Sequence, residues 1–315
     1  MFESSYLIDP GAHTLRIYDP KTRTVHALRS CRLFNRPQVT GDEAIRASWD
    51  ESDHLVYPFG RERITADPAS LLQSLFSRIP AERYLLIPDA AVLSFSMPSP
   101  DLEDAWSRLL HLFKIARIRM VPAFVPEDGE PFFHIHAGAS LVHFVMGKEG
   151  EVLDWQPVKL AGNEIDKAIA TEIARVFQVL ISQEDACALK EVLSRALCEG
   201  RNPVLSVTGL SSHNEYVKIR FRAADLWGCM EPILKELARQ ASEFVCRKGP
   251  ELMEQVLSRP VLVSGGLAPC FGLVPLLKRS LHARIQIAEN PETWLLDTLA
   301  RRKTPFFARN RAAKS

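Results

Sequence analysis

Three glycine-bearing turns hold the residues of this sequence that are best suited to chemistry. Each turn follows a short apolar run, and the three read Asp9-Pro10-Gly11-Ala12, His136-Ala137-Gly138-Ala139 and Ser264-Gly265-Gly266-Leu267. A glycine at the end of a strand lets backbone N–H groups approach a phosphate or a ribose closely. A carboxylate in the same place, such as Asp9, can hold a hydrated Mg²⁺ beside phosphates. The turns therefore indicate a phosphate-binding site, while each one alone is also typical of an ordinary tight turn.

Histidine and cysteine provide the other candidate ligands. His134, His136 and His143 share one face if they lie on strands, because side chains alternate with a period of two. A metal site there is an alternative, but no Glu or Cys lies close to them in the sequence. The six cysteines are scattered and contain no CxxC pair. That spacing favours free thiols in a reducing cytoplasm over a disulfide framework or a zinc site.

An internal repeat predicts two similar domains. The first thirty residues have the pattern of three short strands, and residues 132–158 repeat it, with a turn at residues 147–150. The two segments are also similar in sequence, since Ile8-Asp9-Pro10-Gly11-Ala12 aligns with Ile135-His136-Ala137-Gly138-Ala139. Two similar domains explain such a repeat, and two unrelated hairpins are the alternative.

Helical segments alternate with the strands. Capping signals and apolar periodicity predict helices that begin at Asp67-Pro68, Ser99-Pro100 and Gly162-Asn163, and further helices over about 184–197, 224–246 and 291–300. A hairpin is expected over 203–209 and 215–222, and buried strands over 261–263 and 283–288. Strands that alternate with helices predict an α/β fold.

Composition narrows the class of protein. A chain of 315 residues suits two domains. Its formal net charge of +1 gives no field that would attract nucleic acid. The sequence shows neither a secretory signal nor an apolar run of membrane-spanning length, so we expect a cytoplasmic protein. Residues 301–315 are basic and are expected to form a flexible tail.

Taken in order, the motifs resemble those of the MreB family over residues 5–300. Residues 8–15 look like its first phosphate loop with one residue missing, and Gly41-Asp42-Glu43-Ala44 is similar to its Gly-x-Glu-Ala. Residues 159–169 resemble the family's Gly-Gly-Asp-x-(Phe/Ile)-Asp helix start. Residues 261–273 are similar to the family's adenosine loop, and Ala288-Glu289-Asn290-Pro291 is similar to its Ala-Glu-Asp-Pro.

The resemblance implies the actin-like ATPase fold, with duplicated ribonuclease H-like α/β domains and a central cleft. Domain I would cover residues 1–131 with the helix 291–300 packed back on it, and domain II residues 132–290 with a small subdomain near 183–223. The implied function is that of a cytoplasmic, filament-forming cytoskeletal protein that positions cell-wall synthesis and sets cell shape. Implied partners are copies of itself, a true MreB, membrane proteins of the elongation machinery, and the inner membrane through weak contact of residues 301–315.

The same resemblance assigns the site residues. ATP and Mg²⁺ are the implied cofactors, with Asp9 on the metal side. The phosphates would be faced by Gly11, Ala12, His13 and Thr14 from the first loop and by His136, Gly138 and Ala139 from the second. Gly162 would follow at the helix start, and the adenosine would lie near Lys190, Gly265, Gly266 and Leu267.

Several motifs depart from the family pattern. The second loop has His136, or in a shifted alignment His134, where the family has Asp, and Leu267 replaces a glycine. Pro10 removes a backbone donor, and the proline-broken link over 122–131 leaves no room for the helix that positions water. From these changes we expect a pseudo-ATPase without hydrolysis above background. The alternatives are a non-polymerising scaffold of the same superfamily and a small-molecule kinase of the same superfold.

Overall fold

The chain folds into two compact units. The computed structural model describes residues 5–50, 53–60, 63–79, 89–94, 100–115, 117–124 and 129–301. Unit 1 comprises the described residues up to Phe124 and those from Leu295 onwards, and unit 2 comprises those between Val125 and Trp294. Within the described ranges, no helix combines the length and the apolarity that crossing a membrane requires.

Unit 1 is built on a five-stranded sheet with the strand order β3-β2-β1-β8-β9. Its strands are β1 (Ser5–Pro10), β2 (Thr14–Asp19), β3 (Thr24–Arg29), β8 (Asp89–Ser94) and β9 (Ile118–Pro122). The first three strands form an antiparallel meander, and β8 and β9 continue the sheet parallel to β1. The three predicted N-terminal strands are thus confirmed.

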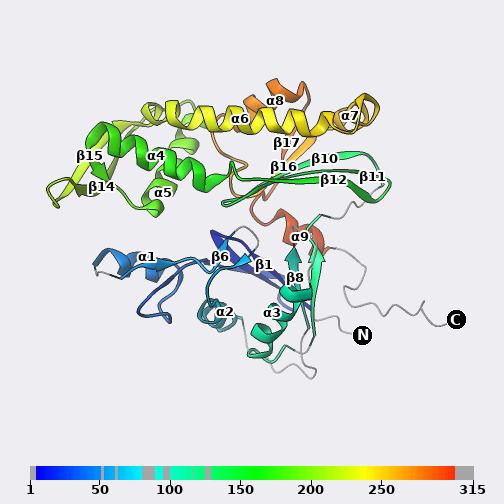
Figure 1. Cartoon of the computed structure of the whole chain (residues 1–315), viewed down its shortest axis with the longest axis horizontal. Helices are drawn as coiled ribbons and strands as arrows, with labels where there is room; N and C mark the ends of the chain where they lie inside the picture. Colours follow the sequence, from blue (N-terminus) through cyan, green and yellow to red (C-terminus); the bar gives the residue numbers. More distant parts are fainter. Residues whose placement is uncertain are drawn as a thin grey trace. The chain divides into compact units, whose positions relative to one another are not determined.

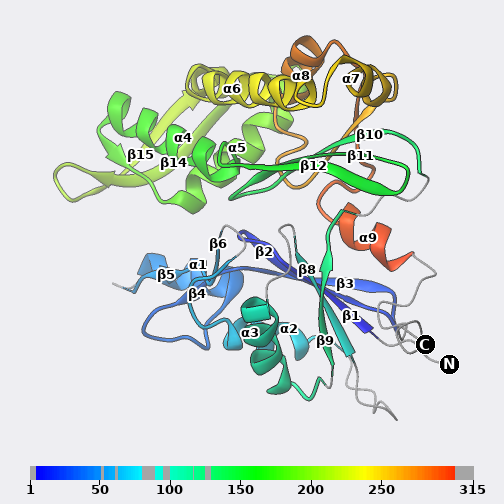
Figure 2. The ribbon, with the colours of Figure 1, turned by 45° about the vertical axis from the view of Figure 1, so that its right-hand side comes forward.

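The sheet of unit 1 is covered on both faces, because neighbouring residues of β1 point in opposite directions. Ile8 packs in a core with α2 (Ala69–Phe76) and α3 (Pro100–His111). Leu7 faces the other way and packs with Leu296 and Leu299 of α9 (Trp294–Ala300). Figures 1 and 2 show α2 and α3 on one side of this sheet and α9 on the other.

Short elements complete unit 1. They are α1 (Gly41–Asp50) and two small ribbons, β4 (Arg32–Leu33) with β5 (Leu55–Val56) and β6 (Phe59–Gly60) with β7 (Arg63–Ile64). Helix α1 starts at the Gly-Asp-Glu-Ala motif, where two acidic residues in the first turn suit the positive end of the helix dipole.

Unit 2 repeats the sheet topology of unit 1. Its order is β12-β11-β10-β16-β17, again a three-stranded antiparallel meander extended by two parallel strands. The strands are β10 (Phe132–Ala137), β11 (Val142–Lys148), β12 (Glu151–Val158), β16 (Val261–Ser264) and β17 (Ile285–Ile287). The predicted turn at 147–150 is present, with Glu149 and Gly150 in the left-handed region. The predicted repeat and the α/β fold are therefore confirmed.

Helices cover the sheet of unit 2 and support a small second sheet. They are α4 (Gly162–Phe177), α5 (Gln183–Cys198), the 3-10 turn η1 (Ala223–Leu226), α6 (Trp227–Cys246), α7 (Pro250–Leu257) and α8 (Leu273–Leu281). The small sheet has the order β13 (Val179–Leu180), β14 (Val204–Ser211) and β15 (Tyr216–Arg222). Phe244 of α6 stacks on Phe133 of β10 with ring centroids 5.7 Å apart, which anchors α6 to the main sheet.

Three predicted boundaries are wrong. The helix expected from residue 224 begins at Trp227, because residues 223–226 form the 3-10 turn η1. The helix expected from residue 291 begins at Trp294, because the carbonyl of Pro291 accepts a hydrogen bond from Gly265 N and residues 291–293 form a turn instead. The strand expected over 283–288 is confined to Ile285–Ile287. Ser99, residues 125–128 of the proline-broken link and the tail beyond residue 301 lie outside the described residues.

Candidate functional site

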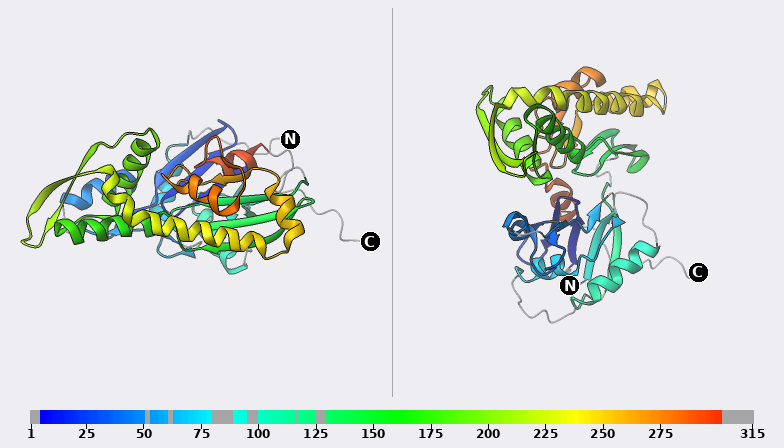
Figure 3. Two further views of the ribbon diagram at one scale, coloured as in Figure 1. Left: turned by 90° about the horizontal axis from the view of Figure 1, so that it is seen from above. Right: turned by 60° about the vertical axis from the view of Figure 1, so that its left-hand side comes forward.

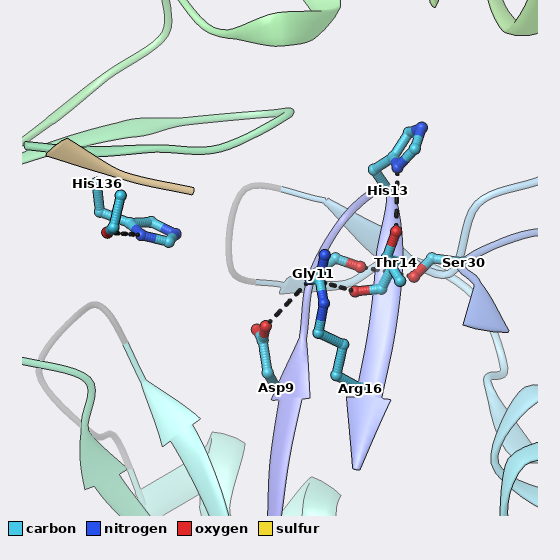
Figure 4. A network of polar contacts seen from close by, with 8 residues as sticks. Asp9, Gly11, His13, Thr14, Arg16, Ser30 and His136 are labelled. Atoms are coloured by element: carbon cyan, nitrogen blue, oxygen red, sulfur yellow. Dashed lines mark hydrogen bonds and ion pairs between the residues drawn. The ribbon is translucent and has the colours of Figure 1, made fainter. Parts of the chain in front are cut away.

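The first glycine turn leaves the end of β1 in unit 1. Asp9 is nearly buried there, and Arg16 is its partner in the β1–β2 register. Arg16 Nη1 lies 3.4 Å from Asp9 Oδ2 and 3.4 Å from the carbonyl oxygen of Thr14. Burial raises the pKa of the Asp9 carboxyl, and the Arg16 guanidinium acts against that shift. Figure 4 shows Arg16 reaching along the strands to Asp9, which fixes the orientation of the carboxylate.

The turn itself tolerates only glycine at position 11. A Cβ on Gly11 would lie 2.5 Å from the carbonyl oxygen of Thr14. Ser30 holds the turn from β3's end: its Oγ donates to Gly11 O at 2.6 Å and its N–H to His13 O at 2.9 Å. His13 Nδ1 is 3.1 Å from Thr14 Oγ1. Residues 11–14, which include Ala12, thus form a tied backbone loop beside a carboxylate.

The second glycine turn has the same geometry at the end of β10 in unit 2. Gly138 N donates to Leu141 O at 3.0 Å, and a Cβ on Gly138 would lie 2.9 Å from that oxygen. A Cβ on Gly11 would likewise collide with a carbonyl oxygen three residues further on, that of Thr14. His136, two residues before Gly138, therefore occupies the place that Asp9 has before Gly11, which supports His136 over His134 as its counterpart.

Helix α4 is joined to this second turn. Gly162 N donates to Gly138 O at 3.1 Å, and Asn163 N donates to Ala139 O at 2.7 Å. These bonds satisfy two of the N–H groups that a helix start leaves without an intrahelical partner. The two bonds therefore fix the backbone of the turn at Gly138 and Ala139 against the helix start at Gly162.

His136 and His134 share one hydroxyl. Ser264 Oγ lies 2.9 Å from His136 Nδ1 and 2.8 Å from His134 Nε2. Burial, with a smaller contribution from His143, lowers the pKa of His134 to about 3, and burial alone lowers the pKa of His143 to about 3. Both rings are therefore neutral at physiological pH. The Trp155 indole N–H donates to His143 Nδ1 at 3.2 Å.

One nitrogen of each ring is engaged, by Ser264 for His134 and His136 and by Trp155 for His143. His134 and His143 are buried and His136 is half-buried, so the three histidines form a hydrogen-bonded group within unit 2. The metal-site alternative stays a prediction, because a histidine binds a metal through one nitrogen while the other is hydrogen-bonded.

The third glycine turn closes over the end of β10. Gly265 has φ of +90°, and a Cβ there would lie 2.3 Å from Ala137 O. Leu267 N donates to the same carbonyl at 2.9 Å, while the Leu267 side chain is buried in the core. Gly266 has no atom within 4 Å of its would-be Cβ. There is thus free space beside Gly266 in this turn, whereas the Leu267 side chain packs in the core of unit 2.

Lys190 forms an ion pair with Asp166, a residue that the sequence analysis did not place in the site. Its Nζ lies 2.7 Å from Asp166 Oδ1 and 3.4 Å from Gly162 O, with both side chains largely buried. Burial raises the pKa of Asp166, and Lys190 opposes this shift. For Lys190 burial lowers the pKa, but Asp166 together with Cys187 and Cys270 raises it by more, so its pKa is raised overall. Asp166 lies four residues beyond Gly162 on α4. That spacing puts both residues on one face of the helix, and it was the signal in the sequence that could have placed Asp166 near the site.

The predicted site residues thus form two local groups. Unit 1 holds Asp9, Gly11, Ala12, His13 and Thr14, and unit 2 holds His136, Gly138, Ala139, Gly162, Lys190, Gly265, Gly266 and Leu267. The donor chemistry fits a Mg²⁺–nucleotide: Asp9 supplies an oxygen ligand of the kind Mg²⁺ prefers, and the tight turns expose backbone.

Comparisons with known proteins agree with this geometry. The family model described as MreB/Mbl protein matches residues 132–303. The cell shape-determining protein Mbl of Bacillus subtilis (strain 168) is 24% identical over 143 residues, which are 45% of this chain and 43% of that protein. The chain therefore matches less than half the length of that relative.

Solved structures share the fold across nearly the whole chain. MreB5 of Spiroplasma citri bound to AMPPNP superimposes with a TM-score of 0.83 at 14% identity, covering 95% of this chain and 96% of that one. The MamK double helical filament gives a TM-score of 0.68 at 16% identity, covering 95% and 100%. The predicted actin-like fold and the resemblance to the MreB family are confirmed.

The prediction of a pseudo-ATPase is wrong. The family model matches more than half of the chain, and MreB5 of the same fold has been solved with both AMPPNP and ADP. The prediction rested on His136 and Leu267, on the backbone donor lost at Pro10, and on the proline-broken link over 122–131. The features that survive are backbone features, namely the glycine turns and the helix start tied to them, and a comparison of side chains undervalues these.

Proposed function

The chain belongs to the MreB/Mbl family, and we propose that it is a bacterial actin-like cytoskeletal protein that assembles from copies of itself and helps to set cell shape. The observation that carries the proposal is the repeated strand–glycine turn at Gly11 and Gly138 on two sheets of identical topology. The MamK filament structure supports assembly as the role of this fold.

We propose further that the chain binds ATP with Mg²⁺. Asp9 would hold the hydrated metal, and Gly11, Ala12, His13 and Thr14 would present backbone and hydroxyl groups to phosphate. Gly138, Ala139 and the start of α4 at Gly162 would form the second phosphate loop, with His136 behind it. Lys190, Gly265, Gly266 and Leu267 would lie toward the adenosine.

Within these loops the chain's own residues have defined tasks. Bound Mg²⁺ would neutralise phosphate charge during transfer to water. Arg16 orients the Asp9 carboxylate, Ser30 fixes the first turn, and the ion pair of Lys190 and Asp166 fixes α4 against α5. Each of these contacts keeps a loop in place before nucleotide arrives, which lowers the cost of ordering on binding.

Partners in the cell belong to the same proposal. Copies of this chain or a true MreB would extend the filament, and membrane proteins of the elongation machinery would couple it to wall synthesis. Weak contact with the inner membrane is assigned to the basic residues 301–315.

Sedimentation with and without nucleotide tests the function. The purified chain should pellet with ATP and Mg²⁺ and release phosphate, and less of it should pellet with ADP. A chain that stays monomeric at high concentration in every nucleotide state, and is left out of filaments of a co-expressed MreB, would rule out the cytoskeletal proposal. Phosphate transfer to a small-molecule acceptor would instead favour the kinase.

A further inference from the structure

The hairpin β14–β15 lies at one end of unit 2 and is not used by the nucleotide proposal. In Figure 3 it projects at the far left of the left-hand view. Its two strands pair antiparallel from Val204–Arg222 to Leu210–Tyr216. In the described part of the chain β15 is the last strand of its sheet, so one of its edges has no strand beside it. Such an edge presents N–H and C=O groups that can pair with another chain.

Positive charge lines one face of β15. Lys218, Arg220 and Arg222 are exposed, whereas the alternating Ile219 and Phe221 are buried in the core of unit 2. The residues opposite the three cations on β14 are Thr208, Ser206 and Val204, so the neighbouring strand offers no carboxylate.

These strand cations differ from the cations on the helices of the same unit. On α4 and α6 the exposed basic side chains form ion pairs one turn apart, such as Lys167 with Glu164 and Lys235 with Glu231. Among the described residues, no ion pair is formed by Lys218, Arg220 or Arg222. Asp225 Oδ2 already accepts from Arg222 N at 2.8 Å, which places a carboxylate at that end of the row. Lys218 and Arg220 are therefore the cations available to an anionic partner.

The start of the strand adds apolar surface. Tyr216 is 71% exposed and Val217 is 37% exposed, and the two side chains point to opposite faces. An added strand would thus meet the Tyr216 ring and the positive charges on one face and Val217 on the other.

We propose that β15 is the docking edge for an extended acidic segment of a partner protein, which adds to the small sheet as a further strand. Main-chain hydrogen bonds would supply affinity, and carboxylates at alternate positions opposite Lys218 and Arg220 would supply selectivity. The same cations disfavour a second copy of this edge, because like charges would face each other. They also exclude the chain's own residues 301–315, which carry only basic charges.

A peptide titration tests this proposal on the full chain without nucleotide, so that it stands apart from the assembly proposal. The probe is a fluorescent seven-residue peptide of alternating Glu and Val, and its binding is followed by anisotropy. We expect binding that weakens with added salt. It should fall at least tenfold in the double variant Lys218→Glu/Arg220→Glu. The matched double variant Lys278→Glu/Arg279→Glu on α8 should bind like the original chain.

Two comparisons separate strand addition from simple charge attraction. A peptide with N-methyl groups on alternate amides of one edge keeps its charge but cannot complete the ladder, so it should lose most of its affinity. Equal binding of the N-methylated peptide, or equal loss in both double variants, would overturn the proposal. So would binding of anionic vesicles or of duplex DNA that exceeds peptide binding and depends on Lys218 and Arg220.

Discussion

Lys190 Nζ and Asp166 Oδ1 lie 2.7 Å apart, with only 11% and 2% of the two side chains exposed. The pair joins α5 to the first turns of α4, next to the glycine turn at Gly138. Opposite charges removed from water in this way are costly to separate, because each would remain buried without its partner.

Replacing Lys190 by Met should therefore destabilise unit 2 strongly. We expect the free energy of unfolding, measured by urea titration, to fall by about 3–5 kcal/mol, the range seen when one member of a buried pair is removed. The double variant Lys190→Met/Asp166→Leu should recover most of this loss. Lys167→Met, which breaks an exposed pair, should cost at most about 1 kcal/mol. A loss no larger for Lys190→Met than for Lys167→Met would show that the pair is not effectively buried.

The buried histidines should make unit 2 sensitive to acid. His134 and His143 have folded-state pKa values lowered to about 3 from 6.5, so the unfolded chain takes up protons first as the pH falls. The free energy of unfolding is therefore unaffected by protonation of these two histidines above pH 6.5, and it falls as the pH drops from 6.5 to 3. At pH 5 the loss is about 2 kcal/mol per histidine.

Urea titrations from pH 7.5 to 5 measure this slope. His143→Phe should make it shallower, while the exposed control His213→Gln should leave it unchanged. An unchanged slope in His143→Phe would contradict a neutral, buried His143.

Two adjacent glycines should differ in their response to the same substitution. Gly265→Ala places a Cβ 2.3 Å from Ala137 O at φ of +90°, so the turn must move away from β10. We expect a loss of stability of about 1–3 kcal/mol and weaker binding of a fluorescent ATP analogue. Gly266→Ala has open space and should be nearly neutral in stability. Equal stability of the two variants would mean that the turn is not held against Ala137.

Asp9 should matter for nucleotide only when Mg²⁺ is present. Asp9→Asn keeps the size of the side chain but removes the charge, and we expect ATP binding with Mg²⁺ to weaken about 10–100-fold. Binding in EDTA should change little. Asp42→Asn on the exposed start of α1 is the matched control. If Asp9→Asn weakens binding equally with and without Mg²⁺, the carboxylate is not on the metal side.

Local patterns in the sequence predicted most of the elements but few of the contacts that define the site. Short apolar runs located β1 and β10, and the Gly162-Asn163 signal located the start of α4, because these features depend on neighbours in the chain. The ion pair of Lys190 with Asp166 spans 24 positions, and the bond of His134 to Ser264 spans 130. No periodicity reports such contacts.

The same limit explains the errors. The turn at 291–293 exists because Pro291 O is bound by Gly265 N, a contact made by tertiary structure. The pseudo-ATPase prediction failed for a related reason. It weighed the residues that differ from the family pattern, whereas the close approach of Gly11 to Thr14 O and of Gly138 to Leu141 O is known only from the backbone.

Helix α9 has a consequence for how the protein is made. One face of the unit 1 sheet, around Leu7, is covered by Leu296 and Leu299, which the ribosome adds only after all of unit 2. At about 5–20 residues per second, roughly 10–30 s pass between synthesis of the last strand of this sheet and synthesis of its cover. During that interval, while unit 2 is being synthesised, the nascent chain carries an apolar face of the unit 1 sheet that α9 does not yet cover. Unit 1 is therefore the part of the newborn protein on which chaperones should act.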